Sequence, residues 1–375
     1  MPVQSTHPPL SQALPPLILG GAGFSNQLNA NPTSLPVRQV IKEAFNLGIR
    51  AIDTSPYYYG PSEQLIGDAL SQPEIVKHYP RKDYILMTKV GRISAAEFNY
   101  SPSCIRTSIL RSLERLDTSY LDVIFCHDAE YITDGETLIA IGVLLDFVRD
   151  GKIRYVGISG YRIDILMRLA KAARQRYSRP LGVVQNWAQL TLQNSRLETQ
   201  GLDSLRNEGV SCVCSSSPLA IGLLRSGGVP QGSLGDFHPA PAGLRAVAKE
   251  AAEFVVAQTG ESMASLALQY ALSRAPLASM ESFRVSTITG ISSVSELKEK
   301  VMAARQILKG PVDGRKGSIL DYSPQKEMQF ERDKSLYKSV RRILGPWVGY
   351  CFPSPGEGWC TERKRMLGQK KSANL

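Results

Sequence analysis

Residues 51–60 read Ala-Ile-Asp-Thr-Ser-Pro-Tyr-Tyr-Tyr-Gly, an apolar pair followed by one carboxylate, a row of phenols and a turn. The apolar residues before Asp53 are typical of the end of a buried strand, because Pro56 and Gly60 cannot continue a strand's hydrogen bonds. An aspartate at that end and Tyr58 in the following loop can share one pocket. A cation in that pocket would keep the carboxylate ionised and would lower the pKa of the phenol. On this segment alone, a turn with surface tyrosines is the simpler interpretation.

Segments with strand and helix character alternate along the rest of the chain. The expected strands are 17–19, 49–53, 84–89, 121–128, 153–159, 181–187, 210–215 and 286–290, and the expected helices are 37–47, 62–70, 103–116, 137–149, 164–176, 202–207, 262–273 and 295–308. This alternation predicts an α/β fold, a (β/α)₈ TIM barrel. No Gly-x-Gly-x-x-Gly motif opens a helix after a strand, which disfavours a Rossmann domain.

Length and composition predict a soluble globular protein with a large core. The chain has 375 residues, of which 43% are hydrophobic and 21% charged. We expect a flexible N-terminal segment at 1–16, the barrel at 17–310 and a C-terminal extension at 311–375. The extension is expected to be partly helical, around 331–343, and then basic and disordered.

The sequence gives no indication of a membrane span or an export signal. No apolar run of about 18 uncharged residues is present, and the N-terminus lacks the basic-then-apolar order of a signal peptide. We therefore expect a cytoplasmic protein, where the six cysteines would be reduced thiols. Cys212 and Cys214 alternate along an expected strand, which favours small core residues over metal ligands, and no zinc spacing occurs.

The formal net charge of +10 could indicate a nucleic-acid partner, so its distribution matters. Residues 311–375 hold 13 Lys and Arg against 7 Asp and Glu, a net charge of +6, which leaves +4 for the rest of the chain. The excess is mostly a property of the C-terminal extension. Most such basic runs are simply solvated, and we expect no nucleic-acid or membrane partner.

Titratable residues stand at the ends of successive expected strands, where the active site of a TIM barrel lies. Asp53, Lys89 and His127 end the second, third and fourth strands, and Tyr58 follows the second. Lys89 would stay charged beside Asp53, and its charge would lower the pKa of Tyr58, which turns a phenol into a usable acid or base. His127 would hold the substrate oxygen by a hydrogen bond.

Each of these residues also has an ordinary structural interpretation. A strand-end lysine is often a solvated rim charge, a strand-end aspartate is often a helix cap, and Asp128 could cap the loop after His127. A lone histidine would favour such an interpretation. Four matching residues at three successive strand ends are much harder to obtain by accident.

Several motifs together are similar to those of the aldo-keto reductase family. They are Asp-Thr-Ser-Pro-Tyr-Tyr at 53–58, Thr-Lys at 88–89, Leu-Asp-Val at 121–123 with Cys-His at 126–127, Val-Gly-Ile-Ser at 156–159, Val-Gln-Asn at 184–186 and Ser-Pro-Leu at 217–219. The resemblance covers roughly residues 15–310. It implies a catalytic tetrad of Asp53, Tyr58, Lys89 and His127. Counting back from Gly60 would place Tyr59 in the role of Tyr58.

The resemblance also implies a nicotinamide cofactor, with contacts at Gly23, Ser159, Gln185, Ser217, Leu219, Gly290, Ser292 and Glu296. NAD is expected rather than NADP, because 289–296 contains no Lys or Arg and Glu296 stands where NADP-dependent members commonly carry Arg. A carboxylate can accept a hydrogen bond from the ribose 2′-hydroxyl but repels a 2′-phosphate. Alternatively, Glu296 only caps the last barrel helix.

Two departures from the common family pattern point to its aldose-dehydrogenase branch. Gly160 follows Ser159 where many members have Asn, and Ser216 precedes the Ser-Pro-Leu motif where many have Tyr. The branch implies NAD-dependent oxidation of an aldose, D-arabinose or a related sugar, at C1 to its lactone. The alternatives are an NADPH-dependent aldehyde reductase and a nicotinamide-binding regulatory subunit without relevant turnover. A monomer or weak homodimer is expected.

A Gly- and Pro-rich insertion at 222–244 is long for a connection inside a compact domain. We interpret it as a substrate-side loop over the barrel mouth. Trp187 and Phe237 are candidate apolar walls of the substrate pocket. Ordinary packing aromatics are an equally good interpretation of both residues.

Overall fold

Parallel strands close into a barrel in the computed structural model, which describes residues 7–56, 60–230, 232, 235–236, 238–308, 312, 324–356 and 359, without the side chains of 324–332. Within these residues eight strands follow one another around the barrel in chain order, and the first also pairs with the last. The strands are β1 (Leu17–Gly20), β2 (Ala51–Asp53), β3 (Ile85–Val90), β4 (Leu121–Cys126), β5 (Ile153–Gly160), β6 (Val183–Trp187), β7 (Cys212–Ser216) and β8 (Arg284–Gly290). The predicted (β/α)₈ barrel is confirmed.

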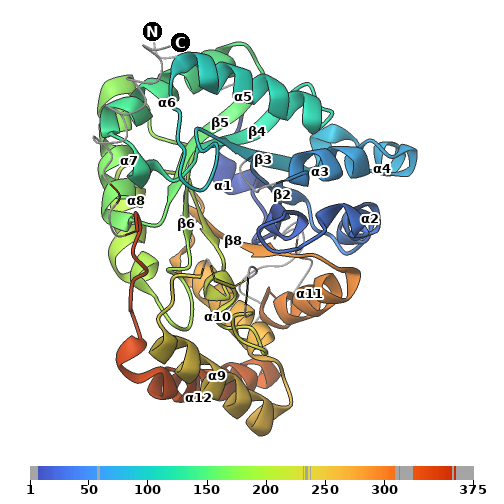
Figure 1. Ribbon diagram of the computed structural model, residues 1–375, viewed down its shortest axis with the longest axis vertical. Helices are drawn as coiled ribbons and strands as arrows, with labels where there is room; N and C mark the ends of the chain where they lie inside the picture. Colours follow the sequence, from blue (N-terminus) through green and yellow to red (C-terminus); the bar gives the residue numbers. More distant parts are fainter. Residues whose placement is uncertain are drawn as a thin grey trace.

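Helices surround the barrel (Figure 1). They are α1 (Leu10–Ala13), α2 (Val37–Asn46), α3 (Ser62–Leu70), α4 (Pro73–His78), α5 (Pro102–Arg115), α6 (Asp134–Arg149), α7 (Ile163–Tyr177), α8 (Leu202–Asn207), α9 (Ala242–Thr259), α10 (Met263–Ala278), α11 (Val294–Leu308) and α12 (Pro324–Leu344). Short helical turns are η1 (Gly21–Phe24), η2 (Pro32–Ser34), η3 (Arg81–Asp83), η4 (Ala129–Tyr131), η5 (Leu197–Gly201), η6 (Ala220–Gly222) and η7 (Gly345–Trp347). Across the described residues, none of these helices combines the length and the apolar character that a bilayer crossing needs.

Most predicted elements recur within a few residues, and three helices were missed. The predicted helices 62–70 and 202–207 coincide with α3 and α8. The short helices α1 and α4 were not predicted from the sequence. Nor was α9 predicted, and its start at Ala242 shortens the loop expected at 222–244.

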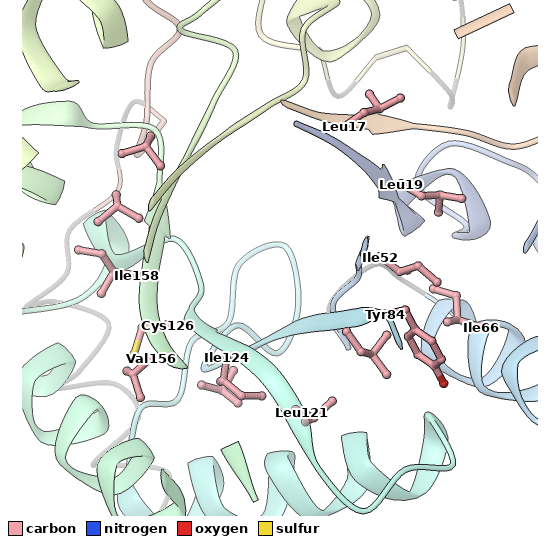
Figure 2. Packing of buried hydrophobic residues seen from close by; sticks show 14 of the residues in the cluster. Leu17, Leu19, Ile52, Ile66, Tyr84, Leu121, Ile124, Cys126, Val156 and Ile158 are labelled. Atoms are coloured by element: carbon pink, nitrogen blue, oxygen red, sulfur yellow. The ribbon is translucent and has the colours of Figure 1, made fainter. Parts of the chain in front are cut away.

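Two apolar layers hold the barrel together. Side chains on the outer faces of the strands pack against the helices, and Figure 2 shows Ile52 of β2 beside Ile66 of α3. A separate cluster fills the barrel interior and includes Ile18, Ala51, Met87, Val123, Phe125, Val183, Cys212, Cys214 and Ile288. Both cysteines are fully buried there, as the alternation along their strand predicts. The barrel is therefore a packed core whose open end carries the polar residues.

The period of two along each strand decides which side chains reach the mouth. Ala51 and Met87 belong to the interior cluster, so Asp53 and Lys89, two residues further along β2 and β3, point inward as well. Val183 of β6 also belongs to the interior cluster, so Gln185, two residues further along the strand, points inward too. Polar residues at these inward positions therefore converge at the carboxyl ends of the strands.

Helices outside the predicted barrel pack against it at both ends of the chain. The segment 1–16, which the sequence analysis expects to be flexible, contains α1, with Leu10 and Leu14 buried against the barrel interior. α12 lies beside α9, in the lower part of Figure 1. Val340 and Leu344 of α12 are fully buried against that part of the molecule. The described part of the C-terminal extension therefore belongs to the same packed body as the barrel.

Candidate active site

A buried ion pair lies at the mouth of the barrel, between the ends of β2 and β3. Lys89 Nζ lies 2.7 Å from both carboxylate oxygens of Asp53 and donates to the Thr54 carbonyl at 3.0 Å. Each side chain of the pair is 2% exposed. Burial raises the pKa of Asp53 above its usual range, while Lys89 and Gln185 oppose that rise. The carboxylate therefore holds a cation in one place at the mouth.

His127 follows β4 and lies at the same mouth. Ser55 Oγ is 3.2 Å from Nδ1 of the imidazole, and Asp128 Oδ2 is 3.5 Å from Nε2. The backbone is held by the Tyr100 hydroxyl, which donates to the His127 carbonyl at 2.6 Å. Burial lowers the pKa of His127 to about 3, although Asp128 opposes the change. The imidazole is therefore neutral at physiological pH and can both donate and accept a hydrogen bond.

An arginine and aspartate pair supports His127, and the sequence analysis missed it. Asp128 adopts a left-handed conformation with φ of 53° and forms an ion pair with Arg92 of the loop after β3. The Arg92 guanidinium in turn lies over the rings of Phe98, at 5.2 Å, and Tyr131, at 5.5 Å. Asp128 thus does more than cap a loop, because it connects His127 to Arg92 of the loop after β3.

The candidate catalytic phenols, Tyr58 and the alternative Tyr59, lie outside the described residues. The described chain stops at Pro56 and resumes at Gly60. Ser55, the last residue but one before the gap, is fixed beside His127. The choice between the two tyrosines therefore stays a prediction.

The predicted cofactor contacts occupy one continuous arc of the mouth. The arc runs from β5 through β8 to β1, because β8 pairs with both β7 and β1. The side chains from β2 to β4 fill the remaining arc. Along the cofactor arc, Ser159 lies at the end of β5, Gln185 in β6, Ser217 and Leu219 after β7, Gly290 at the end of β8, Ser292 and Glu296 after it, and Gly23 after β1.

Gln185 connects the two arcs and offers a free acceptor. Its Nε2 donates to Asp53 Oδ2 across the barrel at 3.4 Å. Its Oε1 is buried and has no hydrogen-bond partner among the residues that the structure describes. A buried carbonyl without a donor is unfavourable, so the site is suited to a ligand that brings an N–H group. The carboxamide of a nicotinamide ring has such a group, and the residues here fit that cofactor.

The segment after β8 carries both a carboxylate and a cation. Glu296 Oε2 accepts the Ser292 backbone N–H and hydroxyl, each at 2.8 Å. Glu296 Oε1 forms an ion pair with Lys300, which also donates to the Gly290 carbonyl. Burial lowers the pKa of Lys300, Glu296 raises it, and the nearby Arg225 lowers it further. Lys300 and Arg225 were not predicted from the sequence, since neither belongs to a motif.

The insertion after β7 is only partly described, and Phe237 lies outside the described residues. His238 is buried, and its Nε2 lies 3.0 Å from the Ala220 carbonyl. Trp187 ends β6 on the inward face that Gln185 defines, and it is half-buried at the mouth. Of the two candidate walls, the structure therefore places Trp187 at the mouth.

Comparison with known proteins identifies the family. The family model described as "Aldo/keto reductase family" matches residues 16–309. The chain belongs to the aldo/keto reductase family. It is therefore an oxidoreductase of a family that uses nicotinamide cofactors, and the resemblance found in the sequence motifs is confirmed.

The relatives of this aldo/keto reductase include two sugar dehydrogenases. The chain is 41% identical over 289 residues to D-arabinose 1-dehydrogenase of Saccharomyces cerevisiae, which covers 76% of this chain and 81% of the relative. It is 35% identical over 269 residues to L-galactose dehydrogenase of Arabidopsis thaliana, which covers 71% of this chain and 77% of the relative. Asp53, Lys89 and His127 lie within residues 16–309, which the family model matches.

A solved structure agrees on the fold of this aldo/keto reductase. The glycerol dehydrogenase from Gluconobacter oxydans superposes with a TM-score of 0.59 and 21% sequence identity, covering 90% of this chain and 93% of that one. At this level of identity the likeness supports the barrel architecture alone.

Proposed function

We propose that this aldo/keto reductase oxidises an aldose, D-arabinose or a related sugar, at C1 to its lactone with NAD. The observation that carries the proposal is the Asp53–Lys89 pair, buried beside a neutral His127 at the mouth. The two sugar dehydrogenases among the relatives support the substrate class. When bound, NAD supplies the acceptor for the hydride that leaves C1.

The chain's own part in this reaction is to remove a proton and to hold the sugar. Tyr58 accepts the proton of the C1 hydroxyl while the C1–H bond breaks and the C1=O bond forms. Lys89 favours the deprotonated phenol, since a cation stabilises a nearby anion. Asp53 keeps Lys89 in position at 2.7 Å. The proton then passes from Tyr58 to water.

His127 orients the sugar oxygen without exchanging a proton of its own. A pKa lowered to about 3 keeps its imidazole neutral during turnover. A neutral imidazole can give one hydrogen bond to the C1 oxygen and still contact Ser55 or Asp128. Its role is therefore to position the reacting oxygen near Tyr58.

For the cofactor we propose NAD, on the basis of Glu296. Its carboxylate carries a negative charge, because Lys300 and Ser292 lower its pKa. A 2′-phosphate next to it would be repelled, whereas a 2′-hydroxyl could donate to it. The contacts to Ser292 also support the alternative, in which Glu296 caps the helix that begins at Val294.

A second candidate is an NADPH-dependent aldehyde reductase, which the cations near Glu296 favour. Arg225 is exposed and has no ion-pair partner within the described residues. Its charge acts on Lys300, so the two cations lie on the same side of the mouth. Lys300 and Arg225 would therefore both lie near a bound 2′-phosphate.

The experiment that tests the proposal compares sugars and aldehydes with both cofactors. D-arabinose, L-galactose, glycerol and a simple aldehyde are each supplied with NAD or NADP in the matching oxidation state, and the near-ultraviolet absorbance of reduced nicotinamide is followed. We expect sugar-dependent reduction of NAD, with kcat lower by at least about 100-fold in Lys89→Met. Faster NADPH-dependent aldehyde reduction would favour the second candidate. Cofactor binding without turnover of any substrate would favour a regulatory subunit.

We further propose that the protein acts in the cytoplasm as a monomer or weak homodimer. In the described part of the chain, Cys104, Cys126, Cys212, Cys214 and Cys351 are free thiols, which is usual in a reducing compartment. The domain division at 1–16, 17–310 and 311–375 also remains our proposal. The family match at 16–309 supports its middle part.

A further inference from the structure

Residues 349–354, here called the C-terminal strap, cross the loops that follow the barrel strands. After α12 the chain runs, in red, past α8 (Figure 1). The Gly349 N–H donates to the Gln193 carbonyl at 2.7 Å, and Asn194 Nδ2 donates to the Tyr350 carbonyl at 3.1 Å. These contacts tie the strap to the loop after β6. The strap therefore lies at the end of the barrel that carries the active site.

The strap backs an aromatic pair that reaches the mouth. Phe352 is 2% exposed, and its N–H donates to the Tyr161 hydroxyl at 2.9 Å. The Tyr161 ring stacks on Phe352 with a centroid distance of 5.9 Å and contacts Trp187 at 4.3 Å. Trp187 occupies an inward position of β6, whereas Tyr161 and Phe352 lie behind it. The position of the Trp187 indole therefore depends on the strap through Tyr161.

One carboxyl group joins the strap to the same tyrosine. Glu130 Oε1 accepts the Tyr161 N–H at 2.7 Å and the Ser354 hydroxyl at 2.9 Å. Glu130 Oε2 is buried and has no partner among the described residues. This oxygen fills the space where a side chain at Gly160 would begin, so any Cβ there would collide with it. The departure from Asn at this position thus makes room for Glu130.

We propose that Glu130 is a positioning residue of the sugar site, which holds the strap and Trp187 in place while it is neutral and releases them when it ionises. The inference rests on the proposed sugar oxidation. An ionised Glu130 would leave one carboxylate oxygen buried without a donor, three residues after His127 and two after the ionised Asp128. Moving Ser354 and the strap away would cost the hydrogen bond to Oε1 but would let water reach the charge and the unpaired oxygen, and the raised pKa of Glu130 indicates that burial outweighs that bond.

The surroundings set the pH at which this change occurs. Burial and the charge of Asp128 raise the pKa of Glu130 to about 7, and the hydrogen bonds from Tyr161 and Ser354 oppose the rise. Closure of the strap is therefore fully favoured below the ordinary pKa of a glutamate, and this preference is lost as pH rises from there through about 7. Among the described residues, Tyr100 from the β3 side, Tyr131 of its own loop and Arg162 of the β5 side also interact with the charge of Glu130.

The first test measures the strap itself, without any substrate. Amide hydrogen exchange of residues 345–356 is compared at about pH 6 and about pH 8.5, corrected for the intrinsic rate. We expect exchange about tenfold faster at the higher pH in the wild type. Glu130→Gln, which imitates the neutral acid, should stay protected at both values. Ser354→Ala should exchange faster at both, and Glu250→Gln, an exposed carboxyl on α9, should behave like the wild type.

The second test measures the sugar site. The KM for the sugar should rise about three- to tenfold as pH rises through about 7 in the wild type, the range that one lost hydrogen bond produces, and stay level in Glu130→Gln. The kcat at saturating sugar should follow the same pH profile in both proteins, because Glu130 touches no reacting atom. A merely structural role would change kcat and KM together at every pH.

The outcomes separate this inference from the proposed function. If wild type and Glu130→Gln show the same pH trend in strap exchange, Glu130 does not control the strap and the inference is wrong. If Glu130→Gln does not fold, the wild-type pH series and Ser354→Ala test the inference instead. Strap exchange in the wild type that does not change with pH would then show the inference to be wrong. If the strap responds as expected but no sugar is oxidised, the proposed function fails while the control of the strap by Glu130 stands.

Discussion

Replacing Lys89 by Met removes the cation of the buried pair with little change in side-chain volume. Asp53 would then be a buried carboxylate whose remaining hydrogen bond comes from Gln185 at 3.4 Å, because Lys89 donates at 2.7 Å to both of its oxygens. Breaking a buried ion pair by removing one partner costs about 3–5 kcal/mol of the free energy of unfolding. We expect a loss of this size at about pH 8.

The loss should depend on pH, since Asp53 can escape the penalty by binding a proton. Burial already raises its pKa, and loss of Lys89 removes the larger of the two opposing influences. In the variant, the native state therefore binds a proton that the unfolded state has released. Stability then falls as pH rises, by up to about 1.4 kcal/mol per pH unit, until the raised pKa of Asp53 is passed.

The assay is urea unfolding of the wild type and Lys89→Met between about pH 5 and about pH 8. The matched control is Asp53→Asn/Lys89→Met, which lacks the charge and should recover most of the stability at the higher pH. The kcat should fall at least about 100-fold in both variants, because Tyr58 loses the cation that makes it a base. Parallel stability curves for Lys89→Met and the wild type would refute the reasoning.

Further expectations concern the phenol, the pH profile and the cofactor. Tyr58→Phe should abolish turnover; if Tyr59→Phe does so instead, the assignment is shifted by one residue, and two active variants would exclude a catalytic phenol in this pair. The kcat of sugar oxidation should rise toward alkaline pH, because a phenol whose ordinary pKa is about 10 is increasingly deprotonated as pH rises. A steady fall of kcat in enzyme shown to be folded would contradict this. The pH profile of kcat should show no inflection from His127, because burial lowers its pKa to about 3. An inflection that is present in the wild type and disappears in His127→Gln would disprove a neutral imidazole. The ratio of kcat/KM for NAD to that for NADP should favour NAD and fall in Glu296→Arg, with Lys300→Met as the control for the paired cation; unchanged selectivity would remove Glu296 from the ribose site.

Some of the fold and of the site could be read directly from local patterns. Apolar strands that end in a polar residue predicted β2, β3 and β4 and the residues at their ends, because a period of two and a parallel barrel place these ends at one mouth. The convergence of Asp53, Lys89 and His127 required no knowledge of contacts. The tyrosine register and the cofactor choice stay predictions, since each depends on a one- or two-residue shift in a loop.

One missed element did carry a local signal. α9 buries Leu244, Ala248, Ala251, Ala252 and Val255, which recur at helical spacing. The Gly and Pro residues before it suggested a single long loop and hid this periodicity. Two shorter features, α4 and α1, have too few residues for a period to be distinguished from chance.

The pairs that connect distant parts of the chain were decided by tertiary structure alone. The Asp128–Arg92 ion pair joins two neighbouring strand loops, and Glu130 reaches Ser354 across 224 residues of sequence. No spacing rule relates such positions, because their distance along the chain says nothing of their distance in space. Composition, periodicity and strand-end chemistry determined the barrel and the residues at its mouth, whereas packing determined how burial shifts their pKa values and which segment covers them.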